Sequence, residues 1–149
     1  MQEHFEQFAA LISGIHGNIK KLKAAYTPEL GLKEVHIFWL YLLKTHPEGM
    51  TASEIAEASR QSRSLVSREI QALLEQDILY TDEENTGKRR YGWKLFLTDR
   101  GKALAERISQ VASQVQSEVS GEIDQQELEI FYKTLRTLSK NFDKLTLEK

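Results

Sequence analysis

The sequence predicts a mainly helical fold with one small β-hairpin, an α+β class. Apolar residues recur every three or four positions along most of the chain, one short segment has a period of two, and helix-capping sequences precede several helical segments. The chain has 149 residues, of which 40% are hydrophobic and 28% charged. This composition is typical of one ordinary globular domain.

Composition also excludes several classes of protein and site. The absence of cysteine excludes disulfides, thiolate zinc sites and iron–sulfur clusters, and the net charge of −2 excludes a uniformly basic surface. The longest apolar run, Ile37 to Leu43, is too short to span a bilayer, and the N-terminus lacks the features of a signal peptide. We expect a cytoplasmic protein with no membrane partner, no cofactor and no metal.

Two helices are predicted to open the chain. Residues 5–26 carry a single apolar stripe, and we expect this helix to end at Thr27, because proline disfavours helix at the residue before it. The second helix, from about Leu32 to Thr45, is apolar on almost every side and is therefore predicted to be the buried central element.

Two shorter helices are predicted next. Thr51-Ala52-Ser53-Glu54 is a capping-box sequence, in which the Thr51 hydroxyl and the Glu54 carboxylate each bond the other residue's amide. Residues 59–62 interrupt this helix. Ser62 or Ser64 is expected to cap the following helix, which ends near Asp77.

A hairpin and two long helices complete the predicted order. Residues 78–80 and 91–97 are rich in β-forming residues, and the polar segment 82–90 between them predicts a protruding charged tip. Thr98 is expected to cap a long helix that stops at Gly121, and Asp124 is expected to cap the last helix.

Two helices joined by a short turn and followed by a two-stranded wing form a winged helix-turn-helix. This arrangement places its second helix in the major groove of DNA. We expect a single domain over 1–149, in which 32–100 form the DNA-binding lobe and 1–26 and 101–149 form a helical dimerisation region.

The second helix of this motif carries side chains that suit DNA. The segment 59–68 contains three arginines and no acid. Arginine bonds guanine and glutamine bonds adenine in the major groove, while serines near a helix N-terminus suit phosphate. The wing tip adds a second cationic cluster. The candidate DNA-binding residues are Arg60, Ser62, Arg63, Ser64, Ser67, Arg68, Gln71, Lys88, Arg89 and Arg90.

These segments resemble the MarR (multiple antibiotic resistance regulator) family of bacterial and archaeal transcription regulators. The resemblance is carried by TASEIAEASRQSRSLVSREIQALLEQDIL and KRRYGWKLFLTDRG, in which Leu97, Thr98 and Gly101 match the L-T-x-x-G that ends the family's wing. It implies an obligate homodimer, a pseudo-palindromic operator and a small-molecule pocket between the dimerisation helices and the DNA-binding lobe. It places residues 62–64, 67 and 68 on the recognition helix and residues 89 and 90 at the wing tip.

The sequence departs from the family pattern at two places. Asp77 stands where members usually have glycine at the end of the recognition helix, and we expect it to adopt the left-handed conformation. The wing tip reads Gly87-Lys88-Arg89-Arg90, so it lacks the Asp-x-Arg pair in which the acid orients the arginine.

The apolar stripes of the predicted terminal helices indicate a dimer. A single copy of so small a fold would leave much of their apolar surface uncovered, whereas a two-fold dimer buries both copies at once. The alternative is a self-contained helical bundle. The candidate interface residues are Phe5, Phe8, Ile12, Val115, Val119, Leu128, Phe131, Leu135, Leu138 and Phe142.

Polar-tipped aromatic residues near the junction of the terminal helices and the core form a candidate ligand site. They could line a pocket for a small aromatic or phenolic effector, or they could be core residues whose polar tips are satisfied. The candidate ligand-binding residues are His16, Tyr26, His36, Trp39 and Tyr41.

The sequence features bear on three classes of function. The first is a homodimeric DNA-binding transcription regulator, a repressor whose operator affinity a ligand modulates. The alternative is a winged-helix protein–protein interaction module without specific DNA readout, which the acid-free face of the second helix disfavours. An enzyme is not expected, because the chain has no glycine-rich phosphate loop, metal-ligand cluster or nucleophile elbow.

Overall fold

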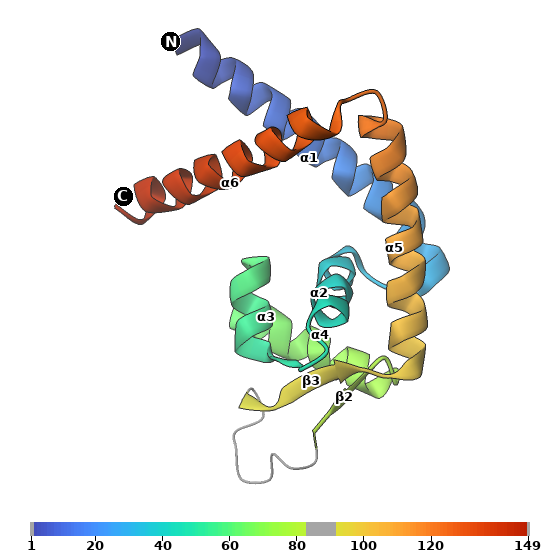
Figure 1. The fold of residues 1–149 in the computed structure, drawn as a ribbon. Helices are drawn as coiled ribbons and strands as arrows, with labels where there is room; N and C mark the ends of the chain where they lie inside the picture. Colours follow the sequence, from blue (N-terminus) through green and yellow to red (C-terminus); the bar gives the residue numbers. More distant parts are fainter. Residues whose placement is uncertain (1, 83–91, 149) are drawn as a thin grey trace. The chain divides into compact units, whose positions relative to one another are not determined.

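The computed structural model describes residues 2–82 and 92–148 and has the predicted mainly helical class (Figure 1). Its elements, in chain order, are α1 (Gln2–Leu30), α2 (Glu34–Thr45), β1 (Met50–Thr51), α3 (Ala52–Ser59), α4 (Arg63–Glu75), β2 (Leu79–Thr81), β3 (Lys94–Leu97), α5 (Asp99–Ser120) and α6 (Gln125–Leu147). Residues 1–109 and 110–149 form two compact units, so the division falls within α5.

The wing contains three strands rather than the two that the sequence predicts. They form an antiparallel sheet in the order β1-β3-β2, with Met50 opposite Leu95 and Leu79 opposite Leu97. The prediction missed β1 because two residues are too few to show a period. The strand expected from Tyr91 begins only at Lys94, and the wing tip lies outside the described residues.

The core of the first unit is built around α2, as its nearly all-apolar sequence predicts. Trp39 and Leu40 are almost completely buried, and Ile55, Val66 and Leu73 from α3 and α4 are fully buried in the same cluster. The apolar face of α4 therefore packs inward, and its opposite face remains exposed. This packing determines which side chains of α4 are available to a ligand.

The predicted end of the first helix is wrong. Helix α1 continues through Pro28 to Leu30 and ends at Gly31, whose φ of 67° is left-handed. The amide of Leu32 donates to the Thr27 carbonyl and the amide of Gly31 to the Pro28 carbonyl, both at 3.3 Å, which is a Schellman motif. A proline in the last turn removes only one helical bond, so the glycine cap decides where the helix ends.

The predicted caps of α3 and α4 are confirmed. The Glu54 amide donates to Thr51 Oγ1 and the Thr51 amide donates to Glu54 Oε1, both at 3.1 Å. Ser62 is the residue that caps α4, because its Oγ accepts from the Leu65 amide at 3.1 Å. Each helix of the motif therefore begins where its sequence predicts.

Replacing Thr51 by alanine is expected to lower the free energy of unfolding by about 1 kcal/mol. The substitution removes the acceptor for the Glu54 amide at the start of α3. Urea denaturation of the wild type and of Thr51→Ala at equal protein concentration checks this expectation. Thr137→Ala is the control, since the Thr137 hydroxyl donates to the Lys133 carbonyl within α6 and caps no helix; an equal loss in both variants would contradict a specific cap.

The end of α4 and the start of α5 are joined through Thr98. Asp77 has the expected left-handed conformation, with φ of 59°. Thr98 Oγ1 accepts from the Gly101 amide at 3.0 Å, as a capping residue does, and lies 2.7 Å from the Asp77 carbonyl oxygen, to which it donates. Gly101 packs directly against the Ile78 carbonyl, so a side chain there would overlap the backbone.

The second unit consists of the end of α5 and the whole of α6. Asp124 stands at the N-cap position of α6, but its side chain makes no capping hydrogen bond, unlike the prediction. No residue of α6 is buried. Among the described helices, none is both long and apolar enough to cross a bilayer.

Candidate DNA interface

The outer face of α4 presents basic and hydroxyl side chains. Arg63, Ser64, Ser67 and Arg68 are all exposed. Arg63 and Ser64 occupy the first turn, where backbone amides without helical partners and the helix dipole favour an anion. The face therefore combines groups that can bond base edges with groups that can bond phosphate.

The two arginines of this face are not engaged within the described chain. Neither Arg63 nor Arg68 forms an ion pair with any residue of 2–82 or 92–148. Their guanidinium groups can therefore bond a nucleic acid without first breaking an internal ion pair.

The other candidate DNA-binding residues differ in how they are presented. Ser62 uses its oxygen in the cap of α4, and Arg60 lies exposed in the turn before it. Gln71 is half-buried and donates to Glu75 Oε1 at 3.0 Å, so adenine readout would require it to leave that carboxylate. Lys88, Arg89 and Arg90 lie outside the described residues.

The buried side of α4 carries a carboxylate that contacts the first turn of α2. Glu69 Oε1 accepts from Lys33 Nζ at 2.8 Å, and Glu69 Oε2 lies 3.0 Å from His36 Nε2. Burial lowers the pKa of His36, and the hydrogen bond from Lys33 lowers the pKa of Glu69. Sequence reasoning missed this cluster, although an acid on the apolar stripe of α4 signals a buried partner.

A cavity of about 520 Å³ lies between α1, α2 and the end of α3. Two of the predicted ligand residues line it, His16 from α1 and Trp39 from α2, whereas Tyr26, His36 and Tyr41 do not. The Trp39 side chain is 1% exposed, and its indole N–H has no hydrogen-bond partner among the residues that the structure describes. Sequence reasoning missed the two cationic lining residues, Lys20 and Lys23.

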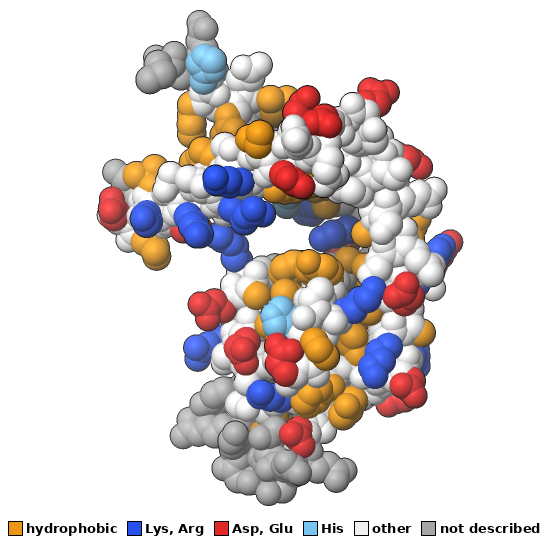
Figure 2. Space-filling view, in the orientation of Figure 1, with side chains coloured by type: hydrophobic (Ala, Val, Ile, Leu, Met, Phe, Trp, Pro, Cys, Tyr) orange, Lys and Arg blue, Asp and Glu red, His pale blue; other side chains and the backbone are white. Residues whose placement is uncertain are grey.

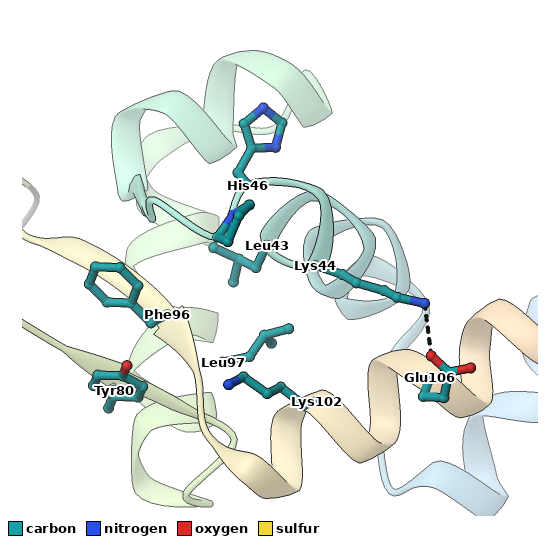
Figure 3. Close-up of a pocket in the computed structure, with 9 residues that line it drawn as sticks. Leu43, Lys44, His46, Tyr80, Phe96, Leu97, Lys102 and Glu106 are labelled. Atoms are coloured by element: carbon teal, nitrogen blue, oxygen red, sulfur yellow. Dashed lines mark hydrogen bonds and ion pairs between the residues drawn. The ribbon is translucent and has the colours of Figure 1, made fainter.

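A second cavity, of about 340 Å³, lies where the wing meets α2 and α5 (Figure 3). Leu43 and Leu97 lie between the aromatic rings of the wing and the ion pair of Lys44 Nζ with Glu106 Oε2, which is 3.0 Å long. None of the predicted ligand residues lines this cavity. The ion pair joins α2 to α5 within the first unit.

The comparison with family models matches residues 30–90 to the MarR family. The fold is similar to that of a Staphylococcus aureus MarR in complex with salicylate and kanamycin, at a TM-score of 0.81 and 18% identity over 93% of this chain and 92% of that one. It is also similar to a S. aureus MepR–DNA complex, at a TM-score of 0.76 and 19% identity over 91% and 96%.

A MarR transcriptional regulator from Methanosarcina mazei Go1 has a TM-score of 0.78 and 18% identity, covering 94% of this chain and 99% of that chain. No curated protein matches the sequence. The matched segment contains α2, α3, α4 and β2, so it includes every described residue of the candidate DNA interface.

Proposed function

Since residues 30–90 of this chain match the model of the MarR family of winged helix-turn-helix transcription regulators, we propose that the chain is a DNA-binding homodimeric repressor and not an enzyme. It binds a pseudo-palindromic operator and is released from it by a small aromatic effector. The observation that carries this proposal is the exposed outer face of α4, with its two unengaged arginines and two serines.

In the proposed complex α4 lies in the major groove. Arg63 and Arg68 bond base edges, while Ser64 and Ser67 bond phosphate oxygens. Gln71 bonds an adenine edge after leaving Glu75. The remaining candidates contact the flanking backbone or the adjacent groove: Arg60, Ser62, Lys88, Arg89 and Arg90. Support comes from the exposure of this face and from a relative of the same fold whose structure contains DNA.

The proposed homodimer covers the apolar faces of the terminal helices. Val119 is 68% exposed and Phe131 is 51% exposed, and Figure 2 shows hydrophobic side chains on the visible surface of these helices. Exposed apolar faces of this length are unusual in monomers. A second copy covers them by two-fold symmetry and sets two recognition helices about 34 Å apart, one DNA turn.

The proposed effector occupies the cavity between α1 and α2. Trp39 lines this cavity with a buried indole N–H that has no partner in the described part of the chain, and Lys20 and Lys23 offer positive charge. Phe38 provides an aromatic wall. These groups suit a planar aromatic acid, and a S. aureus relative of the same fold was solved with salicylate.

Salicylate is expected to quench the fluorescence of Trp39 in a Trp93→Phe background. Lys20→Gln is expected to weaken this binding by about two- to fivefold, because it removes one exposed cation from the cavity. A fluorescence titration measures both values. Lys21→Gln is the matched control, since Lys21 does not line the cavity; equal weakening in both variants would contradict a site at Lys20.

Selection from a library of random duplex DNA at physiological salt tests the proposed function. Recovery of a two-fold symmetric site with half-sites one turn apart is the expected result, together with a dimer mass in sedimentation equilibrium. A reporter with this site across its promoter should be transcribed less when the protein is present. Recovery of no motif, at any effector concentration, would favour the alternative, a winged-helix module that binds a partner protein.

A further inference from the structure

The recognition helix is held on its buried side by one charged group. Glu69 follows Arg68 directly, but it points to the core while Arg68 points to solvent. Each Glu69 oxygen bonds a different residue at the start of α2: one lies 2.8 Å from Nζ of Lys33, the N-cap residue, and the other lies 3.0 Å from Nε2 of His36 in the first turn. A buried carboxylate is costly unless it is paired, so α4 is strongly favoured in the position that keeps both bonds.

The hydrogen bonds of His36 determine its protonation state. Its Nδ1 accepts from the backbone amide of Lys33 at 3.1 Å, so Nδ1 carries no proton. Its Nε2 must then carry the proton and donate it to Glu69. A neutral imidazole in this tautomer satisfies both partners.

Protonation of His36 would disrupt this arrangement at one atom. A proton on Nδ1 would face the Lys33 amide, so two donors would oppose each other. Lys33 is also the N-cap residue of α2, and its side chain holds the other oxygen of Glu69. Protonation of His36 therefore disturbs the start of α2, which supplies both contacts with Glu69 on α4.

The direction of the pH effect follows from burial and from the two neighbouring charges. Burial lowers the pKa of His36 despite Glu69 on α4, which raises it, and Lys33 on α2 lowers it further. The folded chain then binds fewer protons than the unfolded chain below about pH 6.5. The contribution of His36 to stability is present above that pH and is lost as the pH falls.

Glu69 changes stability in the same direction but at lower pH. The bond from Lys33 lowers its pKa, so its contribution is present above about pH 4.5 and is lost as the pH falls through the lowered value. Acidification is therefore expected to affect the His36 bond before the Glu69 carboxylate is protonated.

We propose that Lys33, His36 and Glu69 form a clamp that positions α4 on α2, and that protonation of His36 opens the clamp and reduces sequence-specific DNA binding. His36 and Glu69 are positioning residues that do not touch DNA. Their effect falls on sequence-specific contacts, because base readout depends on the placement of Arg63 and Arg68 more closely than phosphate contact does.

The clamp predicts a pH-dependent specificity. The full-length protein is titrated against its selected duplex and a scrambled duplex at constant ionic strength, between about pH 8 and pH 5, with circular dichroism confirming the fold. The ratio of the two affinities should fall with acid in the wild type, by roughly two- to thirtyfold. It should stay flat in His36→Gln, whose amide can donate to Glu69 but does not titrate.

Matched variants make this test specific. His46→Gln, which changes a histidine outside the clamp, should keep the wild-type profile. A flat wild-type profile, or an equal fall in His36→Gln, would overturn the proposal. If the selection recovers no duplex, that result counts against the proposed function. The clamp is then tested by the position of the proton on the His36 ring, measured as described next.

Two further measurements address the clamp at neutral pH. Glu69→Gln should lower the affinity ratio, whereas Glu48→Gln, which changes an exposed acid outside both the clamp and the candidate DNA interface, should not. If Glu69→Gln fails to fold, Lys33→Met removes one bond of the clamp from a side chain that is 68% exposed. Nitrogen-15 chemical shifts should show His36 protonated at Nε2; a proton at Nδ1 would overturn the clamp.

Discussion

Arg68→Ala is expected to weaken binding to the selected operator duplex by about 1–3 kcal/mol, roughly five- to hundredfold, and to relax preference at one base pair. The side chain is exposed and has no ion pair within the described chain, so its removal leaves the internal contacts of α4 intact. The loss therefore measures a contact to DNA. Fluorescence anisotropy with the operator and with single-base variants of it gives both quantities.

Arg107→Ala is the matched control for this measurement. Arg107 is an exposed arginine on α5, outside the candidate DNA interface. It should leave affinity and base preference close to the wild type. An equal loss on every sequence in Arg68→Ala would mean that Arg68 contacts only phosphate and would contradict its proposed role as a base reader.

Gly101→Ala is expected to lower the free energy of unfolding by about 1–3 kcal/mol or more. A Cβ at this position would overlap the Ile78 carbonyl oxygen and lie 3.2 Å from Leu97 Cδ2. Because the obstacle is backbone, the start of α5 or the strand connection must shift. Urea denaturation at equal protein concentration measures the change, since the stability of a dimer depends on concentration.

Gly17→Ala serves as the control for that substitution. Gly17 also lies within a helix, but a Cβ there would have no atom within 4 Å. It should therefore stabilise α1 by about 0.5–1 kcal/mol, because alanine loses less conformational entropy in a helix. Equal destabilisation by the two substitutions would contradict the close approach at Gly101.

Local sequence signals were sufficient to predict most of the fold. Thr51 with Glu54, and Ser62, cap the helices that they were expected to cap, because capping bonds join residues three positions apart. The left-handed conformation of Asp77 was expected from the resemblance, because members of the MarR family usually have glycine at this position. The resemblance to the MarR family, carried by such segments, is confirmed.

Where two local signals competed, the sequence was ambiguous. Pro28 and Gly31 both favour the end of α1, and the structure shows that the helix ends at the glycine cap. Strand β1 was missed because a strand of two residues exists only through its pairing with β3. Neither the end of α1 nor strand β1 can be predicted from hydrophobic periodicity, because both depend on which hydrogen-bond partner the backbone finds.

The sequence by itself determined the order of the helices and the basic outer face of α4, because both depend on neighbours within about one helical turn. Only the tertiary structure decided the partners of the buried polar groups. Glu69 and His36 are 33 residues apart in the chain, and packing of α4 on α2 brings them within 3.0 Å. A buried charge needs a partner, but its sequence position does not say which one.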